Sequence, residues 1–156
     1  MLRRIVPIVA AAVFAASAQK YDGPVPPKPD LPYLKHAENL VPTEALTAKP
    51  EKKKDDTLYT IEGASSPART PLASPIFLMK ADKVIPDHIQ LFKLESKGGH
   101  REILFPAKKQ PKAIRLVVTR LSPDNIYKIE VDESLEAGEY SLSSTDNDVV
   151  FCFQVY

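Results

Sequence analysis

The sequence predicts an all-β fold, an antiparallel β-sandwich of about 8–10 short strands behind a proline-rich N-terminal leader. From residue 75 onward, short apolar runs recur with polar or turn residues between them, and within each run the apolar residues alternate with period two. These stripes are Ile114, Leu116 and Val118; Tyr127, Ile129 and Val131; Tyr140 and Leu142; and Val149, Phe151, Phe153 and Val155. Two sheets packed face to face would bury them, and a closed barrel is the competing architecture.

Residues 1–18 have the pattern of a secretory signal peptide. Arg3 and Arg4 precede the apolar run 5–16, and the small residues Ala16, Ser17 and Ala18 precede the expected cleavage site. A membrane-spanning helix needs about 20 apolar residues, more than this run provides. We therefore expect export by the general secretory route to the periplasm or the cell exterior, with no transmembrane segment after cleavage.

Residues 19–30 are predicted to form an extended linker, and residues 31–156 the β-sandwich domain. Ten of the fifteen prolines lie between Pro24 and Pro75, and the densest run falls in the linker, where fixed φ angles and missing amide hydrogens favour extended chain. Within the domain, the charged segment 49–56 is predicted to be a solvated loop. The segment 63–75, rich in small residues and proline, is a candidate interaction loop, and its single charge is Arg69.

The remaining elements follow from strand and turn signals. Strands are expected at 33–36, 40–46 and 57–61, the second confined to a sheet edge by its proline. Turns are expected at Gly98-Gly99, where both glycines can adopt positive φ, at 122–125 and at 146–148. No helix is predicted in the domain.

The segment Leu135-Glu136-Ala137-Gly138-Glu139-Tyr140 resembles the tyrosine corner of immunoglobulin-like and fibronectin-III-like sandwiches. More broadly, the chain resembles exported β-rich bacterial proteins that end in such a hairpin. The resemblance implies a structural role for Leu135, Gly138 and Tyr140, with the tyrosine hydroxyl bonded to nearby backbone. It implies no activity, substrate or cofactor.

Charge and cysteine content narrow the class of partner. The chain has 21 Lys and Arg against 20 Asp and Glu, and removal of residues 1–18 changes the formal net charge from +1 to −1. This balance gives no electrostatic reason to expect a nucleic-acid partner. Cys152 is the single cysteine, so it cannot form an internal disulfide; we expect a buried thiol, with pairing to another chain as the alternative.

No pattern in the sequence predicts a catalytic residue, a cofactor or a metal. His36, His88 and His100 are scattered, without metal-ligand spacing or a serine elbow. The acidic groups at 132–139 and 146–148 lack the order of a calcium loop and are interpreted as solvated turn carboxylates. Most aromatic residues fall in the core stripes. The aromatics left for a surface platform are Tyr21, Tyr33 and Tyr59.

These observations favour an exported, non-enzymatic β-sandwich module with a binding or structural role at the cell envelope, where an envelope protein or a glycan would be the partner. The alternative is a secreted hydrolase or metal-dependent enzyme whose site is assembled only by the fold. Pairing of an exposed edge strand with a partner protein is a further option. A polar pocket that gathers a histidine with carboxylates would favour the enzyme, whereas an apolar groove would favour the binding module.

Overall fold

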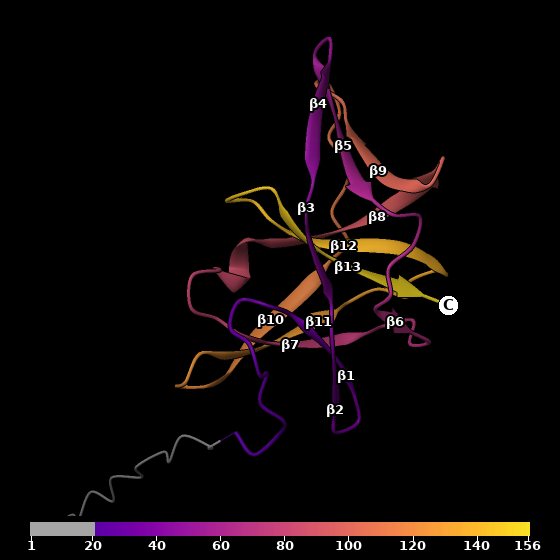
Figure 1. Ribbon diagram of the computed structural model, residues 1–156. Helices are drawn as coiled ribbons and strands as arrows, with labels where there is room; N and C mark the ends of the chain where they lie inside the picture. Colours follow the sequence, from indigo (N-terminus) through magenta and orange to yellow (C-terminus); the bar gives the residue numbers. More distant parts are fainter. Residues whose placement is uncertain (1–20) are drawn as a thin grey trace, which may run out of the picture.

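The computed structural model describes residues 21–156, and this part of the chain is all-β, with thirteen strands and one short 3₁₀ turn, Pro86–His88 (Figure 1). The predicted signal peptide, residues 1–18, lies outside the described residues, as do Gln19 and Lys20 of the predicted linker. Within residues 21–156 there is no helix with the length and hydrophobicity needed to cross a bilayer.

The strands form two sheets. Every pair of neighbouring strands is antiparallel except one. The first sheet has, in spatial order, β10 (Leu116–Ser122), β11 (Ile126–Val131), β7 (Ile76–Lys80), β1 (Tyr33–His36) and β2 (Asn39–Pro42). The second sheet curls into a half-barrel and has the order β3 (Glu44–Thr47), β13 (Val149–Val155), β12 (Gly138–Ser144), β8 (Ile89–Lys97), β9 (His100–Phe105), β5 (Asp56–Glu62) and β4 (Lys49–Lys53). The two-residue strand β6 (Arg69–Thr70) pairs in parallel with the end of β13.

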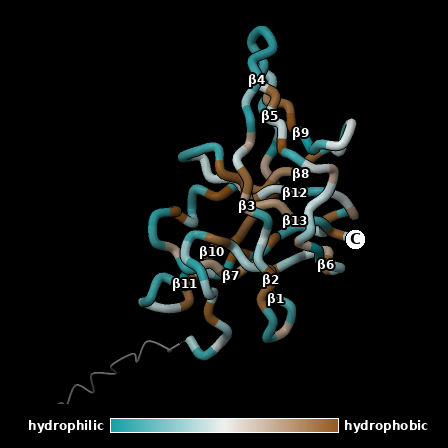
Figure 2. Tube along the Cα trace, viewed as in Figure 1, coloured by the Kyte–Doolittle hydropathy of each residue, from teal (hydrophilic) through white to brown (hydrophobic). Residues whose placement is uncertain are grey.

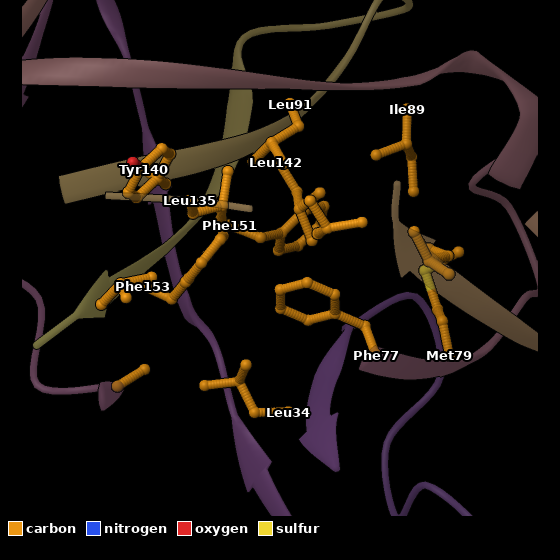
Figure 3. Packing of buried hydrophobic residues seen from close by; sticks show 14 residues of the cluster. Leu34, Phe77, Met79, Ile89, Leu91, Leu135, Tyr140, Leu142, Phe151 and Phe153 are labelled. Atoms are coloured by element: carbon orange, nitrogen blue, oxygen red, sulfur yellow. The ribbon is translucent and has the colours of Figure 1, made fainter. Parts of the chain in front are cut away.

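The main hydrophobic core lies where the two sheets face each other (Figure 3). Phe77 of the first sheet meets Phe153 of the second edge to face, with ring centroids 5.0 Å apart, and Tyr140 stacks on Phe153 at 5.6 Å. The predicted apolar stripes are confirmed by this packing, except at Tyr127, which is half-buried and lies outside the core cluster. Buried in the core are Ile129, Val131, Tyr140, Leu142, Phe151, Phe153 and Val155, and partly buried against it are Ile114, Leu116, Val118 and Val149.

One extended segment, residues 39–53, serves both sheets. It pairs with β1 as β2, crosses to β13 as β3, and then pairs with β5 as β4, so the two edge strands of the curled sheet are neighbours in the chain (Figure 1). The crossings are fixed by hydrogen bonds to backbone carbonyls. The amide and the hydroxyl of Thr43 both donate to the Pro32 carbonyl, at 3.1 and 2.7 Å, and the amide of Ala48 donates to the Asp148 carbonyl at 2.8 Å.

The predicted turns are confirmed. Gly98 and Gly99 connect β8 to β9 with φ values of 58° and 84°, a backbone that residues with a Cβ rarely adopt. Residues 122–125 connect β10 to β11, closed by a hydrogen bond from the Asn125 amide to the Ser122 carbonyl. Residues 146–148 lie in the connection between β12 and β13.

The prediction of about 8–10 strands is too low, and two segment predictions are wrong. The charged segment 49–56, predicted as a loop, holds β4 and the turn into β5, because backbone pairing forms a hairpin even though every β4 side chain is exposed. Figure 2 shows this hairpin as hydrophilic towards its tip. The single strand predicted at 40–46 is two strands, since the chain changes sheets at Thr43.

Part of the predicted linker packs against the sheets. Pro26 is buried, and Pro29 forms an isolated parallel bridge with Lys80. The Asp30 carboxylate accepts hydrogen bonds from the amides of Asp82, Lys83 and Val84 at 2.8–3.1 Å. These contacts anchor the start of the domain to the connection that follows β7.

Tyr140 joins the core to the connection that precedes its own strand. Its hydroxyl donates a hydrogen bond to the Glu136 carbonyl at 2.8 Å, and its ring is 2% exposed. Leu135, from the same connection, is buried in the core, and Gly138 starts β12 opposite Val155.

Replacement of Tyr140 by Phe should lower the free energy of unfolding by about 1 kcal/mol, because it leaves the Glu136 carbonyl without this donor while keeping the ring in place. Urea denaturation measures the change. Y127F is the matched control, since the half-buried Tyr127 hydroxyl makes no hydrogen bond with the described residues. Equal effects of the two variants would contradict the structural role of the Tyr140 hydroxyl.

Candidate functional site

The concave face of the curled sheet encloses a pocket of about 480 Å³. The pocket lies on the side of β12 and β13 that faces away from the first sheet, because side chains alternate between the two faces of a strand. Its walls come from β5, β8, β9, β12 and β13, and its rim from the connection between β12 and β13. Both faces of the central strands are thus in use.

One wall of the pocket is aromatic. Phe105 contacts Tyr59 and Phe92 edge to face, each with ring centroids 5.3 Å apart. Ile103 stands directly opposite Tyr59 in the pairing of β5 with β9, and Ile61 continues the same face of β5. Contributions from three strands make this wall part of the sheet rather than of a loop.

The neighbouring strand β12 carries small polar groups beside this wall. Ser141 and Ser143 follow each other on one face of β12, and their hydroxyls are 3.2 Å apart. Ser141 pairs with Phe92 across the sheet, and Ser143 pairs with Gln90. Ser141 is only 2% exposed, so its hydroxyl is nearly shielded from bulk water. The pocket therefore has an apolar side and a hydroxyl-bearing side.

The rim consists of Asp146, Asn147 and Asp148 in the turn between β12 and β13. The Asp146 carboxylate lies 3.0 Å from Nδ1 of His88, and the side-chain oxygen of Asn147 accepts from the Val149 amide at 2.9 Å. The Asp148 side chain makes no hydrogen bond or ion pair with the described residues. The backbone carbonyl of Asp148 accepts a hydrogen bond from the Ala48 amide.

The fully buried side chain of Arg101 lies inside the half-barrel and is not among the residues that line the pocket. Its guanidinium donates to the carbonyls of Glu62 and Gly63 at 2.6 and 2.8 Å and to the Glu44 carboxylate at 2.8 Å. Since Arg101 lies on β9 and Glu44 on β3, the bond between their side chains crosses the interior from one arm of the curled sheet to the other.

Glu139 completes this buried cluster. Its Oε1 accepts the Ser66 amide at 2.6 Å and lies 3.9 Å from Nη1 of Arg101. Desolvation raises the pKa of this carboxyl above its ordinary value, and the Ser66 amide and the Arg101 charge only partly oppose that effect. The interpretation of Glu139 as a solvated turn carboxylate is therefore wrong, because β12 begins one residue earlier and turns this side chain inward.

Cys152 lies beside the cluster and is fully buried, as predicted. Desolvation raises its pKa to about 12, so the thiol stays protonated at neutral pH. Its carbonyl accepts the Ser66 hydroxyl at 3.1 Å, which fixes the segment 63–75 to β13.

The other predicted site residues lie away from the pocket. Arg69 is on β6, where its Nε donates to the Gln154 side chain at 2.8 Å and its guanidinium lies 4.2 Å from the ring centroid of Tyr156. The tyrosine-corner residues Leu135 and Tyr140 face the main core. Of the three aromatics left for a surface platform, Tyr59 lines the pocket, but Tyr33 is buried, with 5% exposure, so that part of the expectation is wrong.

The three histidines are held at separate places: His36 against the Thr70 hydroxyl, His88 against Asp146, and His100 against Glu102. Among residues 21–156 no group of three or more His, Cys, Asp or Glu side chains is placed to hold a metal ion. The acidic residues Asp132 and Glu136 lie in exposed ion pairs with Arg115 and Lys93.

Phe92, Phe105 and Arg101 were not singled out by the sequence analysis. Two sequence patterns could have indicated them. The first is apolar residues in succession, as in Leu91 and Phe92 of β8 and in the run 149–153 of β13, which is typical of strands buried on both faces. The second is the alternation in β9. Arg101, Ile103 and Phe105 share one face of β9.

Comparison with protein-family models, with curated proteins and with solved structures gives no match to this chain. We therefore infer the function from the geometry of the pocket.

Replacement of Glu139 by Gln should change the pH dependence of stability. Because the pKa of Glu139 is raised in the folded state, the unfolded state loses this proton first, and the residue's contribution to the free energy of unfolding falls as pH rises from about 4.3 through the folded pKa. E139Q lacks this loss, so its stability relative to the unsubstituted protein should increase between pH 4 and pH 7.

Denaturation curves at several pH values test this. E133Q, which removes an exposed carboxylate from the preceding loop, is the control for the loss of one carboxylate, and the two variants are compared at each pH. A difference for E139Q that decreases with pH would mean that Arg101 stabilises the charged carboxylate more than burial destabilises it.

Proposed function

We propose that this protein is an exported, non-enzymatic binding module that holds a small, largely apolar ligand in the pocket of its curled sheet. The observation that carries the proposal is the aromatic wall of Tyr59, Phe92 and Phe105 inside a concave pocket of about 480 Å³. Ligand pockets usually measure about 300–1,000 Å³, are mainly apolar, and have a few polar groups that orient the ligand.

The construction of the pocket supports ligand binding over a purely structural role. Its walls stand on paired strands, so little conformational entropy is lost when a ligand binds. The lining residues come from one face of the curled sheet and from the rim at 146–148. A pocket of this size fits a small molecule, whereas an extended peptide would need a longer groove or an unpaired edge.

The proposed export of the protein is supported by the signal-peptide pattern of residues 1–18, and it implies a periplasmic or extracellular ligand at the cell envelope. We also propose an immunoglobulin-like relationship for the layered part of the fold. It is supported by the hydrogen bond from Tyr140 to the Glu136 carbonyl.

A secreted hydrolase is the second candidate, favoured by the contact of His88 with Asp146 at the rim. Hydrolysis by such a pair would also need a serine within reach of the imidazole. The pocket serines have other partners: Ser141 and Ser143 bond to each other, and the Ser144 hydroxyl accepts the Asp146 amide. Within the described residues no serine side chain is hydrogen-bonded to His88, and we therefore place binding first.

Titration with N-phenyl-1-naphthylamine, a neutral fluorescent probe, tests the proposal. We expect a saturable rise in fluorescence with one site per chain. Ser143→Phe should abolish it, because the new ring would project from β12 into the pocket. Amide chemical-shift changes on binding should concentrate in residues 141–150.

Thr119→Phe is the matched control, since it adds the same ring at an exposed position of the first sheet and should leave binding unchanged. Absence of saturable binding by the unsubstituted protein, or shift changes confined to the first sheet, would overturn the proposed function.

A further inference from the structure

We infer that the pocket selects an alkylammonium ligand, a primary organic amine with an apolar body, over neutral or anionic compounds of the same shape. This inference rests on the proposed binding function and names the chemical class of its ligand. Three features of the pocket carry it: the charge of its rim, the composition of its aromatic wall and the hydroxyl pair beside that wall.

The charged residues that line the pocket are both acidic. They are Asp146 and Asp148, and no lysine or arginine of residues 21–156 is among the lining residues. Asp146 shares its carboxylate with His88, whereas Asp148 has no side-chain partner among the described residues. A carboxylate at the mouth of an apolar pocket attracts a cationic head group and repels an anionic one.

The aromatic wall adds a second attraction for a cation. A cation within about 6 Å of an aromatic ring centroid is attracted by the negative face of the ring. Tyr59 and Phe92 each lie 5.3 Å from the central Phe105, and all three residues line the pocket. The same rings accept an apolar body.

The hydroxyl pair provides acceptors for N–H groups. Each serine hydroxyl has one donor and two lone pairs, and the contact between Ser141 and Ser143 uses one donor and one acceptor. The remaining lone pairs of the half-buried Ser143 hydroxyl can accept from a primary ammonium, which has three N–H donors. This capacity favours a primary amine over a quaternary one.

The buried Arg101 does not oppose a cation in the pocket. Its charge is paired with the Glu44 carboxylate at 2.8 Å and lies near Glu139, and the guanidinium is fully buried. The positive charge is therefore compensated within the base of the half-barrel.

Three probes that share a phenylbutyl body test the inference: 4-phenylbutylamine, 4-phenylbutan-1-ol and 5-phenylpentanoate. Amide-detected NMR titrations of the full-length protein at pH 7 and low salt give the three affinities. We expect the amine to bind about fivefold more tightly than the alcohol, and the carboxylate to bind more weakly than both. Addition of 0.5 M NaCl should reduce the preference for the amine.

Asp148→Asn should lower the amine affinity about threefold and leave the alcohol affinity unchanged. Asp124→Asn, in the turn of residues 122–125 in the first sheet, is the matched control and should change neither. A spectrum that keeps the dispersion of the unsubstituted protein shows that each variant is folded.

The outcomes separate the two proposals. Equal affinity for amine and alcohol, or tighter binding of the carboxylate, would overturn the selection of an ammonium group and leave the binding pocket intact. Binding of none of the three probes, together with no binding of N-phenyl-1-naphthylamine, would overturn the binding function itself.

Discussion

The buried guanidinium of Arg101 is the interaction on which the shape of the molecule depends. It reaches from β9 across the half-barrel to Glu44 on β3, and it also holds the backbone of Glu62 and Gly63 where β5 ends. A charge without solvent is unfavourable unless its hydrogen-bonding capacity is used, and loss of one partner of a buried pair costs about 3–5 kcal/mol. These requirements allow few arrangements of the two arms, so the guanidinium specifies a curled sheet over a flat one.

The curl of the second sheet determines how the face that points away from the first sheet is buried. A flat second sheet would bury Phe151 and Phe153 against the first sheet and expose Val150 and Cys152 on its other side. In the curled sheet both sets are buried, the first in the main core and the second in the half-barrel. The pocket is the part of the half-barrel that side chains leave unfilled. Strand register places its lining residues on one face of the curled sheet.

Particular residues show how much of this could be predicted. The alternation of Phe151 and Phe153 and the Gly98-Gly99 turn are local signals, and they identified the layered core and the hairpin correctly. The second core could not be found in that way, because Glu139, Ser141 and Ser143 have the composition of an outward face. Glu139 lies on the inner face because Arg101, distant in sequence, is its partner. The two serines lie there because they line the pocket. Phe92, next to Leu91, was the local hint that β8 is covered on both sides.

Native-state amide hydrogen exchange of Arg101→Met tests this account most directly. The substitution keeps an unbranched side chain but removes the donors that join the two arms. The account predicts that amides of β3, β5 and β9 lose protection, while those of β7 and β11 in the first sheet keep theirs. Unchanged protection in β3 and β5 would show that the sheet stays curled without the guanidinium and would contradict the account.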